Sequence, residues 1–231
     1  MSDIIHEIAR RPTTKYILIL YGIASLYFII YDYSDIAYFH PALIFTRRWY
    51  TIIMAPLVCN SPLIALISAL NIGYIGMKIE LKIGSEKYLY SIIIGYLLTI
   101  ACSYLLYLIP FLPQFLTPFF LGPGPVVSFM SILYFIQQRY ESFTILSFSF
   151  PSAVYVFFVF VLHITASGGY VAVHIIAMTV AYFFPVIFPG YVKWPVNNAQ
   201  NMEHRNGYYV KKPTMKKRMG KWAGNGHSLN E

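Results

Sequence analysis

The sequence predicts an all-α membrane protein with six membrane-spanning helices, and three observations lead to this fold class. Of the 231 residues, 58% are hydrophobic and only 11% are charged, which is outside the range of soluble globular domains. Long stretches of the chain contain no Asp, Glu, Lys or Arg. The Lys and Arg residues between these stretches gather on one side, as they do in membrane proteins.

The uncharged stretches set the number of helices. Four of them have lengths of 16, 29, 51 and 51 residues, and they are residues 16–31, 49–77, 88–138 and 142–192. A helix needs about 20 apolar residues to cross the hydrocarbon core of a bilayer. Each of the first two stretches therefore predicts one span.

The two longest stretches are too long for a single span and contain helix-breaking residues near their middle. In the third stretch, seven Pro and Gly residues lie between positions 110 and 125, and in the fourth a Ser-Gly-Gly sequence occupies residues 167–169. Such clusters end helices because Pro lacks a backbone N–H and Gly favours turns. Each stretch therefore predicts a hairpin of two spans, which brings the total to six.

The distribution of basic residues predicts the orientation. Six spans place both termini on the same side, and with cytoplasmic termini 15 of the 17 Lys and Arg residues lie in the cytoplasm. Only Arg47 and Arg48, in an outer loop at residues 32–48, lie on the other side. The positive-inside rule favours this topology. Because it accounts for most of the formal net charge of +8, nucleic acid is not an expected partner.

Three regions are expected along the chain. Residues 1–14 form a cytoplasmic N-terminal segment, predicted as a helix on the membrane surface with a frayed terminus as the alternative. Residues 15–190 form the membrane domain. Residues 191–231 carry eight Lys and Arg residues and almost no aliphatic ones, which predicts a disordered cytoplasmic tail.

Few residues in the predicted spans offer chemistry. No Asp, Glu, Lys or Arg lies within them, which disfavours a proton-coupled pump or a carboxylate ion site. The ionisable groups there are His163 and His174, each expected to bond a neighbouring helix. Cys59 and Cys102 are expected to be reduced packing residues. No catalytic residue, metal site or cofactor is predicted.

A serine nucleophile would need a Ser on a Gly-supported helix start with a His within reach. Ser128 follows Gly124 and Pro125 but lacks small flanking residues, and the sequence Gly-x-Ser-Gly occurs nowhere in the chain. His174 could approach it. At most one member of a Ser–His pair is therefore expected to be in place.

Four short segments carry a resemblance to a known family. The first is Pro-Thr-Thr-Lys-Tyr at residues 12–16, and the second is the turn at residues 78–85. The third is the outer-loop segment with Tyr38, Phe39, Pro41, Leu43, Ile44, Phe45 and, beyond it, Trp49. The fourth pairs Gly169 with His174 in the predicted sixth span.

The end of the tail adds a fifth feature, in which a Trp and a Leu flank two glycines: Trp222, Gly224, Gly226 and Leu229. An exposed Trp and Leu in a disordered segment are suited to anchor it in a partner's pocket. With the four segments above, this box resembles the derlins, the rhomboid-like pseudoproteases of the endoplasmic reticulum (ER). The chain departs from the family pattern at Val173, which replaces a Gly, and at Tyr50, where the Arg after Trp49 is expected.

The resemblance implies a rhomboid-like fold without catalysis and a role as a retrotranslocation factor in ER-associated degradation. Such a protein binds misfolded substrates, thins the bilayer and recruits the valosin-containing AAA ATPase, here through Trp222–Leu229. It resides in the ER membrane, works with an ER ubiquitin ligase complex and forms homo- or hetero-oligomers. Two alternatives stay open: an active rhomboid protease that uses Ser128 and His174, and a small transporter or channel, which the absence of an internal repeat disfavours.

Overall fold

Helices make up most of the computed structural model, which describes residues 2–31, 37–43, 45–46, 48–59, 61–109, 118–138, 142–145, 148–166 and 170–192. All of these residues belong to one compact unit, Met1–Pro195. In chain order the elements are α1 (Ser2–Ala9), α2 (Pro12–Tyr31), η1 (Pro41–Leu43), α4 (Thr51–Met54), η2 (Ala55–Leu57), α5 (Pro62–Ile83), α6 (Ser85–Tyr107), α7 (Gly124–Gln137), β1 (Ser142–Ile145), β2 (Phe148–Pro151), α8 (Ser152–Ala166) and α9 (Ala172–Ile187).

Among the described residues, three helices are long and apolar enough to cross a membrane. They are α2, α5 and α6, with 20, 22 and 23 residues. At 1.5 Å per residue these helices are about 30–35 Å long, which matches the roughly 30 Å hydrocarbon core of a bilayer. The composition and length of these helices confirm the membrane-helical class that the sequence predicts.

The helix breaks predicted within the two longest uncharged stretches are confirmed. In the third uncharged stretch α6 ends at Tyr107 and α7 begins at Gly124, and in the fourth α8 ends at Ala166 and α9 begins at Ala172. The helices after the first break are shorter: α7, α8 and α9 have 14, 15 and 16 residues. They contain no Asp, Glu, Lys or Arg, but at about 21–24 Å each is shorter than the core of an ordinary bilayer.

Two boundaries differ from the prediction. The turn expected at residues 78–85 is reduced to Gly84, which has a φ of +87°, because α5 continues through the charged residues to Ile83. The fourth uncharged stretch begins with strands instead of a helix: β1 and β2 pair antiparallel, with Ser142 opposite Pro151. Aromatic and β-branched residues favour strands there, and α8 begins directly after Pro151.

The centre of the structure is α7, which packs against α5, α6, α8 and α9. Most of its side chains are buried, as expected for a helix that is apolar on all sides. Phe129 of α7 meets Phe184 of α9 edge to face at 5.5 Å, and its ring packs directly on Gly95 of α6. In contrast, α2 lies at the periphery, where only Thr14, Tyr21 and Ser25 are buried.

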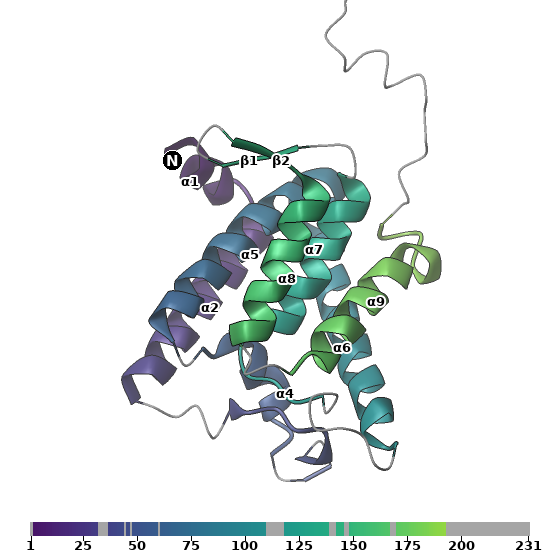
Figure 1. Cartoon of the computed structure of the whole chain (residues 1–231). Helices are drawn as coiled ribbons and strands as arrows, with labels where there is room; N and C mark the ends of the chain where they lie inside the picture. Colours follow the sequence, from purple (N-terminus) through teal and green to yellow (C-terminus); the bar gives the residue numbers. More distant parts are fainter. Residues whose placement is uncertain are drawn as a thin grey trace, which may run out of the picture. The chain divides into compact units, whose positions relative to one another are not determined.

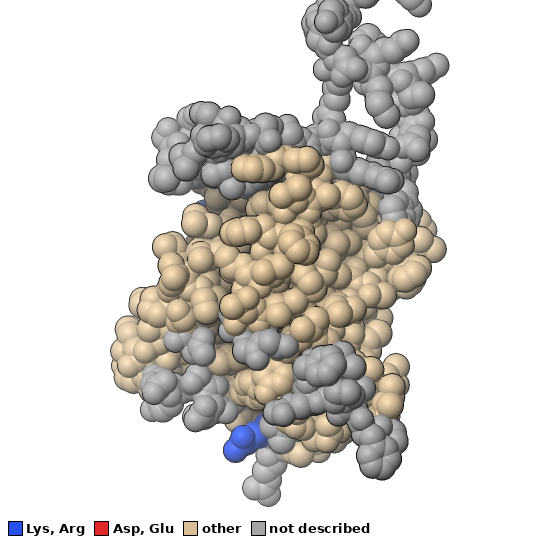
Figure 2. Space-filling model, in the orientation of Figure 1, with Lys and Arg blue, Asp and Glu red and all other residues tan. Residues whose placement is uncertain are grey.

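The outer surface of the helices is apolar. Large hydrophobic side chains on α2, α5, α6, α8 and α9 are about half exposed or more. Among the described residues on the face seen in Figure 2, charged groups are few, with blue at the lower edge and a trace at the upper left. In Figure 1, α1 and the β1–β2 hairpin lie at one end of the helices and α4 lies at the other. This surface is suited to a membrane and not to water.

Candidate functional site

The start of α7 is shaped by Gly and Pro residues. Gly122 has a φ of +106° and donates its N–H to the carbonyl of Ala55 at 2.9 Å, which ties this turn to η2. Pro125 stands in the first turn of α7, where a missing N–H costs nothing. A Cβ on Gly124 would lie 2.5 Å from Cε1 of His174, so only a glycine allows α9 to approach α7 this closely.

Ser128 lies one helical turn after Gly124 and therefore faces the same neighbour. Its hydroxyl oxygen is 3.0 Å from Nδ1 of His174, across a sequence separation of 46 residues. Both side chains are buried, with exposed fractions of 2% and 0%. The expectation that at most one member of this pair would be in place is wrong, because a serine and an imidazole meet here at hydrogen-bond distance. That contact is the basic geometry of a nucleophile and its general base.

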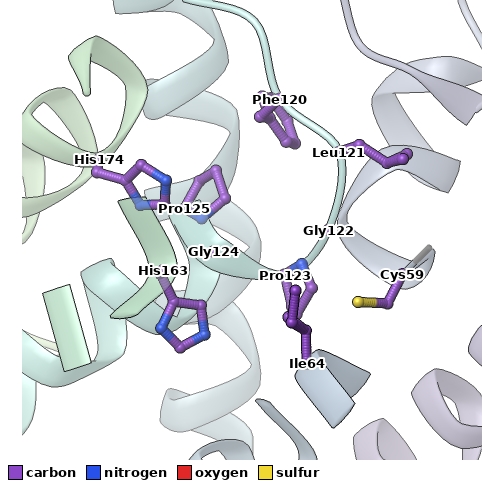
Figure 3. A pocket seen from close by; sticks show the side chains of 10 residues that line it. All are labelled: Cys59, Ile64, Phe120, Leu121, Gly122, Pro123, Gly124, Pro125, His163 and His174. Atoms are coloured by element: carbon purple, nitrogen blue, oxygen red, sulfur yellow. The ribbon is translucent and has the colours of Figure 1, made fainter. Parts of the chain in front are cut away.

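Space around the pair is limited. A cavity of about 10 Å³ adjoins it, lined by Cys59, Ile64, Phe120, Leu121, Gly122, Pro123, Gly124, Pro125, His163 and His174 (Figure 3). This volume holds about one water molecule. The described residues that line it include His174 but not Ser128. Because Ser128 is itself buried, a peptide bond cannot reach its hydroxyl without a rearrangement of α7 and α9.

The second buried imidazole joins two helices. Nδ1 of His163 lies 2.8 Å from the carbonyl oxygen of Val159, and Nε2 lies 3.2 Å from the hydroxyl of Ser68 on α5. Because a carbonyl only accepts, Nδ1 is the donor, and Nε2 accepts from Ser68. This confirms the expectation that His163 bonds a neighbouring helix, and the bond of His174 to α7 is of the same kind.

A groove of about 500 Å³ lies between α5 and α8. Its walls are mostly apolar, with Leu70 and Tyr74 on α5 and Phe158 on α8. One polar contact crosses it, from the hydroxyl of Tyr155 to the side-chain oxygen of Asn71 at 2.6 Å. The groove therefore has a mainly apolar lining with one polar pair within it.

The outer-loop segment that carries the family resemblance, residues 38–49, has some side chains in the core and others on the surface. Phe39 is fully buried and forms an antiparallel bridge with Phe120, just before α7, and Pro41 is also buried. Phe45 and Trp49 are exposed, at 79% and 59%. The motif therefore anchors the loop at one end and presents aromatic side chains at the other, as residues at a membrane interface do.

Tyr38 and His40 complete an aromatic cluster in this loop. The His40 ring stacks on Phe119 at 4.2 Å, and its Nδ1 accepts the N–H of Ala42 at 3.1 Å. Burial lowers the pKa of His40, so the neutral ring is favoured. Burial, with Tyr170 close by, raises the pKa of Tyr38.

The role of Glu80 is not evident from the sequence. This residue is 1% exposed near the end of α5, and one carboxylate oxygen accepts the N–H of Thr14 at 2.9 Å and its hydroxyl at 2.7 Å. The other oxygen accepts the N–H of Thr13 at 3.1 Å and the hydroxyl of Ser85 at 2.6 Å. Glu80 therefore caps the first turn of α2 from a neighbouring helix. One local feature of the sequence points to this role. Glu80 is an acidic residue near a helix C-terminus, where the helix dipole disfavours a negative charge unless other groups stabilise it.

Several predicted site residues lie outside the described part of the chain: Ile44, Gly169, Trp222, Gly224, Gly226 and Leu229. For Leu43, the structure describes its place in η1 but not its side chain. The proposed docking of the tail and the Gly169 position therefore stay predictions. Compared with family models, curated proteins and solved structures, the chain matches none of them.

Proposed function

We propose that the chain is a six-span, rhomboid-like protein of the ER membrane that acts as a derlin-like retrotranslocation factor in ER-associated degradation. It binds misfolded proteins within the bilayer, and its tail recruits the valosin-containing AAA ATPase, which supplies the pulling force. An ER ubiquitin ligase complex is its expected companion. The observation that carries this proposal is the shortness of α7, α8 and α9.

Short helices favour a thinned bilayer. The three helices fall about 6–9 Å short of a 30 Å hydrocarbon core. Thinning costs only fractions of a kcal/mol per Å of mismatch, whereas a charged side chain at the bilayer centre costs about 2.5–3.5 kcal/mol on insertion scales. The packing of the short helices offsets the free-energy cost of local thinning. A thinner hydrocarbon core in turn lowers the barrier for polar segments that must cross it.

The groove between α5 and α8 supports substrate binding. The groove has a volume of about 500 Å³ and is lined by residues of α5 and α8 together with Ile8 of α1 and Leu18 of α2. The apolar walls suit a membrane-inserted segment. Asn71 and Tyr155 offer polar groups to a segment that itself contains polar side chains. Such a mixed lining suits misfolded segments of varied sequence better than one exact ligand.

The enclosure of Ser128 favours a pseudoprotease over the second candidate, an intramembrane serine protease. The hydrogen bond between Ser128 and His174 is the specific observation in favour of that second candidate. A fluorophosphonate probe on the purified full-length chain separates the two. No labelling is expected, whereas labelling that disappears in Ser128→Ala would establish the protease. If the pair is structural, Ser128→Ala costs about 1–3 kcal/mol of stability, because it removes a buried hydrogen bond.

Substrate binding is tested by filling the groove between α5 and α8. Leu70→Trp adds bulk at a lining residue that is 65% exposed, and Leu66→Trp makes the same change on the same helix outside the groove, at a residue that is 59% exposed. Photocrosslinking of a misfolded membrane substrate should fall several-fold with Leu70→Trp and stay unchanged with Leu66→Trp. Equal crosslinking in both variants would contradict a substrate site in this groove.

Recruitment of the ATPase is tested in the tail. Trp222→Ala combined with Leu229→Ala leaves all charges in place, so it should abolish retrieval of the ATPase from detergent extracts and slow the degradation of a misfolded ER protein. Binding of the tail to anionic vesicles, which depends on charge, should persist. Retrieval of the ATPase at wild-type levels by the double variant would refute this docking site.

A further inference from the structure

The first helix, α1, reaches the groove between α5 and α8 with one side chain. Ile8 of α1 is one of the lining residues of this groove, beside residues of α5 and α8 and Leu18 of α2. In Figure 1, α1 lies at the end of the helices that carries the β1–β2 hairpin, and α8 begins directly after β2. The chain's own N-terminal helix therefore contributes to one end of the groove.

Ile8 fits there because α5 has a glycine at the contact. A Cβ on Gly73 would lie 3.3 Å from Cδ1 of Ile8 and 3.3 Å from Cδ1 of Leu18, which is closer than ordinary van der Waals contact. Gly73 also lines the groove. The missing side chain at residue 73 therefore leaves a notch in the groove wall, and Ile8 and Leu18 fill it.

The described side chains of α1 differ sharply in exposure. Ile8 is half-buried, whereas His6, Glu7 and Ala9 are exposed. Among these four residues, Ile8 alone is positioned to hold α1 against the groove. An attachment through one half-buried apolar side chain is weak compared with the packing of the longer helices.

The junction between α1 and α2 allows α1 to pivot. The N–H groups of Arg10 and Arg11 donate to the carbonyls of Glu7 and Ile8 at 3.1 and 2.9 Å, and α2 then begins at Pro12. Pro lacks a backbone N–H and disfavours helical geometry in the residue before it, so α1 does not continue into α2. Because α1 is strongly amphipathic, it can lie on the membrane surface when it leaves the groove.

Ile8 and a bound substrate exclude each other at this end of the groove. A substrate segment that fills the groove must contact the wall at Gly73, where Ile8 already packs. Close-packed side chains leave no room for both. Since Ile8 and an apolar substrate segment present the same chemistry to the wall, they compete for it directly.

We propose that α1 is an autoinhibitory flap, whose Ile8 occupies one end of the groove until an apolar substrate segment displaces it. The released α1 then lies on the membrane surface. This inference rests on the proposed substrate groove and adds the regulation of that site.

The first experiment tests the docking of α1 without any substrate. It uses the full-length chain in nanodiscs, with both native cysteines replaced by Ala, and follows labelling by a water-soluble maleimide. Ile8→Cys should react several-fold more slowly than Ala9→Cys. Gly73→Leu fills the notch and should raise the rate of Ile8→Cys to that of Ala9→Cys, whereas Gly22→Leu, at a residue with nothing within 4 Å of an added Cβ, should not. Equal rates for Ile8→Cys and Ala9→Cys in the parent chain would refute the docking.

The second experiment tests the competition with a substrate. The probe is a synthetic single-span peptide with a photoactivatable leucine, and its crosslinks to the groove are counted. Ile8→Asn should raise them several-fold, and Ala9→Asn, the matched change at the exposed neighbour, should leave them unchanged. A short bis-methanethiosulfonate linker between Ile8→Cys and Leu18→Cys tethers α1 in its docked position. Crosslinks should fall several-fold in the tethered chain and return when a reductant cleaves the linker.

The outcomes separate the flap from the substrate groove. Crosslinks that Leu70→Trp removes, but that are equal in Ile8→Asn and Ala9→Asn and indifferent to the tether, would overturn the flap and leave the groove in place. Crosslinks that persist in Leu70→Trp would instead refute the substrate groove, and the regulatory role of α1 with it.

Discussion

Replacing Glu80 by Ala is expected to loosen α2 from the rest of the helices. The Glu80 carboxylate accepts four hydrogen bonds, and three of them come from Thr13 and Thr14 in the first turn of α2. One backbone N–H points at each oxygen, which suits a carboxylate, an acceptor-only group. The fourth bond, from Ser85, ties the same carboxylate to the start of α6. The substitution therefore removes the point where three helices meet.

The magnitude follows from the burial of the donors. Thr14 is fully buried, so its N–H and its hydroxyl would both lose their partner without water to replace it, at about 1–3 kcal/mol per group. The donors of Thr13 and Ser85 are half-buried and can bind water instead. The expected loss in unfolding free energy is about 2–6 kcal/mol, a large part of the 5–15 kcal/mol that proteins typically have.

Glu80→Gln is expected to cost less, about 1–3 kcal/mol. The remaining amide oxygen can still accept both donors of Thr14, but the new amide group turns an N–H toward the N–H of Thr13. Glu86→Ala is the matched control, because Glu86 is exposed in the first turn of α6. Its loss should cost less than about 1 kcal/mol, the usual effect of an acid at a helix N-terminus.

The assay is an SDS titration of the full-length chain in mild detergent. Unfolding is followed with a thiol-reactive dye at Cys59, which is 3% exposed in the folded structure, in a Cys102→Ala background. The midpoints should fall in the order wild type, Glu86→Ala, Glu80→Gln and Glu80→Ala. If Glu80→Ala unfolds at the same SDS midpoint as the wild type, or if Glu80→Gln loses as much unfolding free energy as Glu80→Ala, the capping role of Glu80 is refuted.

Two further predictions concern close packing and pH. Gly95→Ala is expected to lower the free energy of unfolding by about 1–3 kcal/mol, because an added Cβ would clash with the Phe129 ring. Gly22→Ala is the control and should change it little, because nothing lies within 4 Å of the added Cβ. Equal midpoints for the two variants in the SDS titration would contradict this prediction. Burial lowers the pKa of His40, so the unfolded chain takes up a proton at a higher pH than the folded one. Stability should therefore be fully present above about pH 6.5 and decline as the pH falls below it. Thermal unfolding across this range should show the decline in the wild type and less of it in His40→Gln, and identical profiles would refute the assignment to His40.

Local features of the sequence determined the class of this protein. Uncharged stretches long enough to cross a bilayer predict membrane helices, because a charged group is costly in hydrocarbon wherever it stands. The Pro and Gly residues between Tyr107 and Gly124 and those after Ala166 end helices through their own backbone geometry. These properties belong to short segments, so no knowledge of packing is needed to predict them.

Tertiary structure decided what the polar residues do. The family resemblance placed a turn at residues 78–85, but α5 continues through Glu80, because donors 66 and 67 residues away satisfy the buried carboxylate. The meeting of Ser128 with His174 depends on the packing of α9 on α7, where Gly124 leaves room for the imidazole, and no spacing in the sequence encodes that approach. Contacts of this kind arise from helices brought together by burial of their apolar faces, so they exist only once the whole fold is formed.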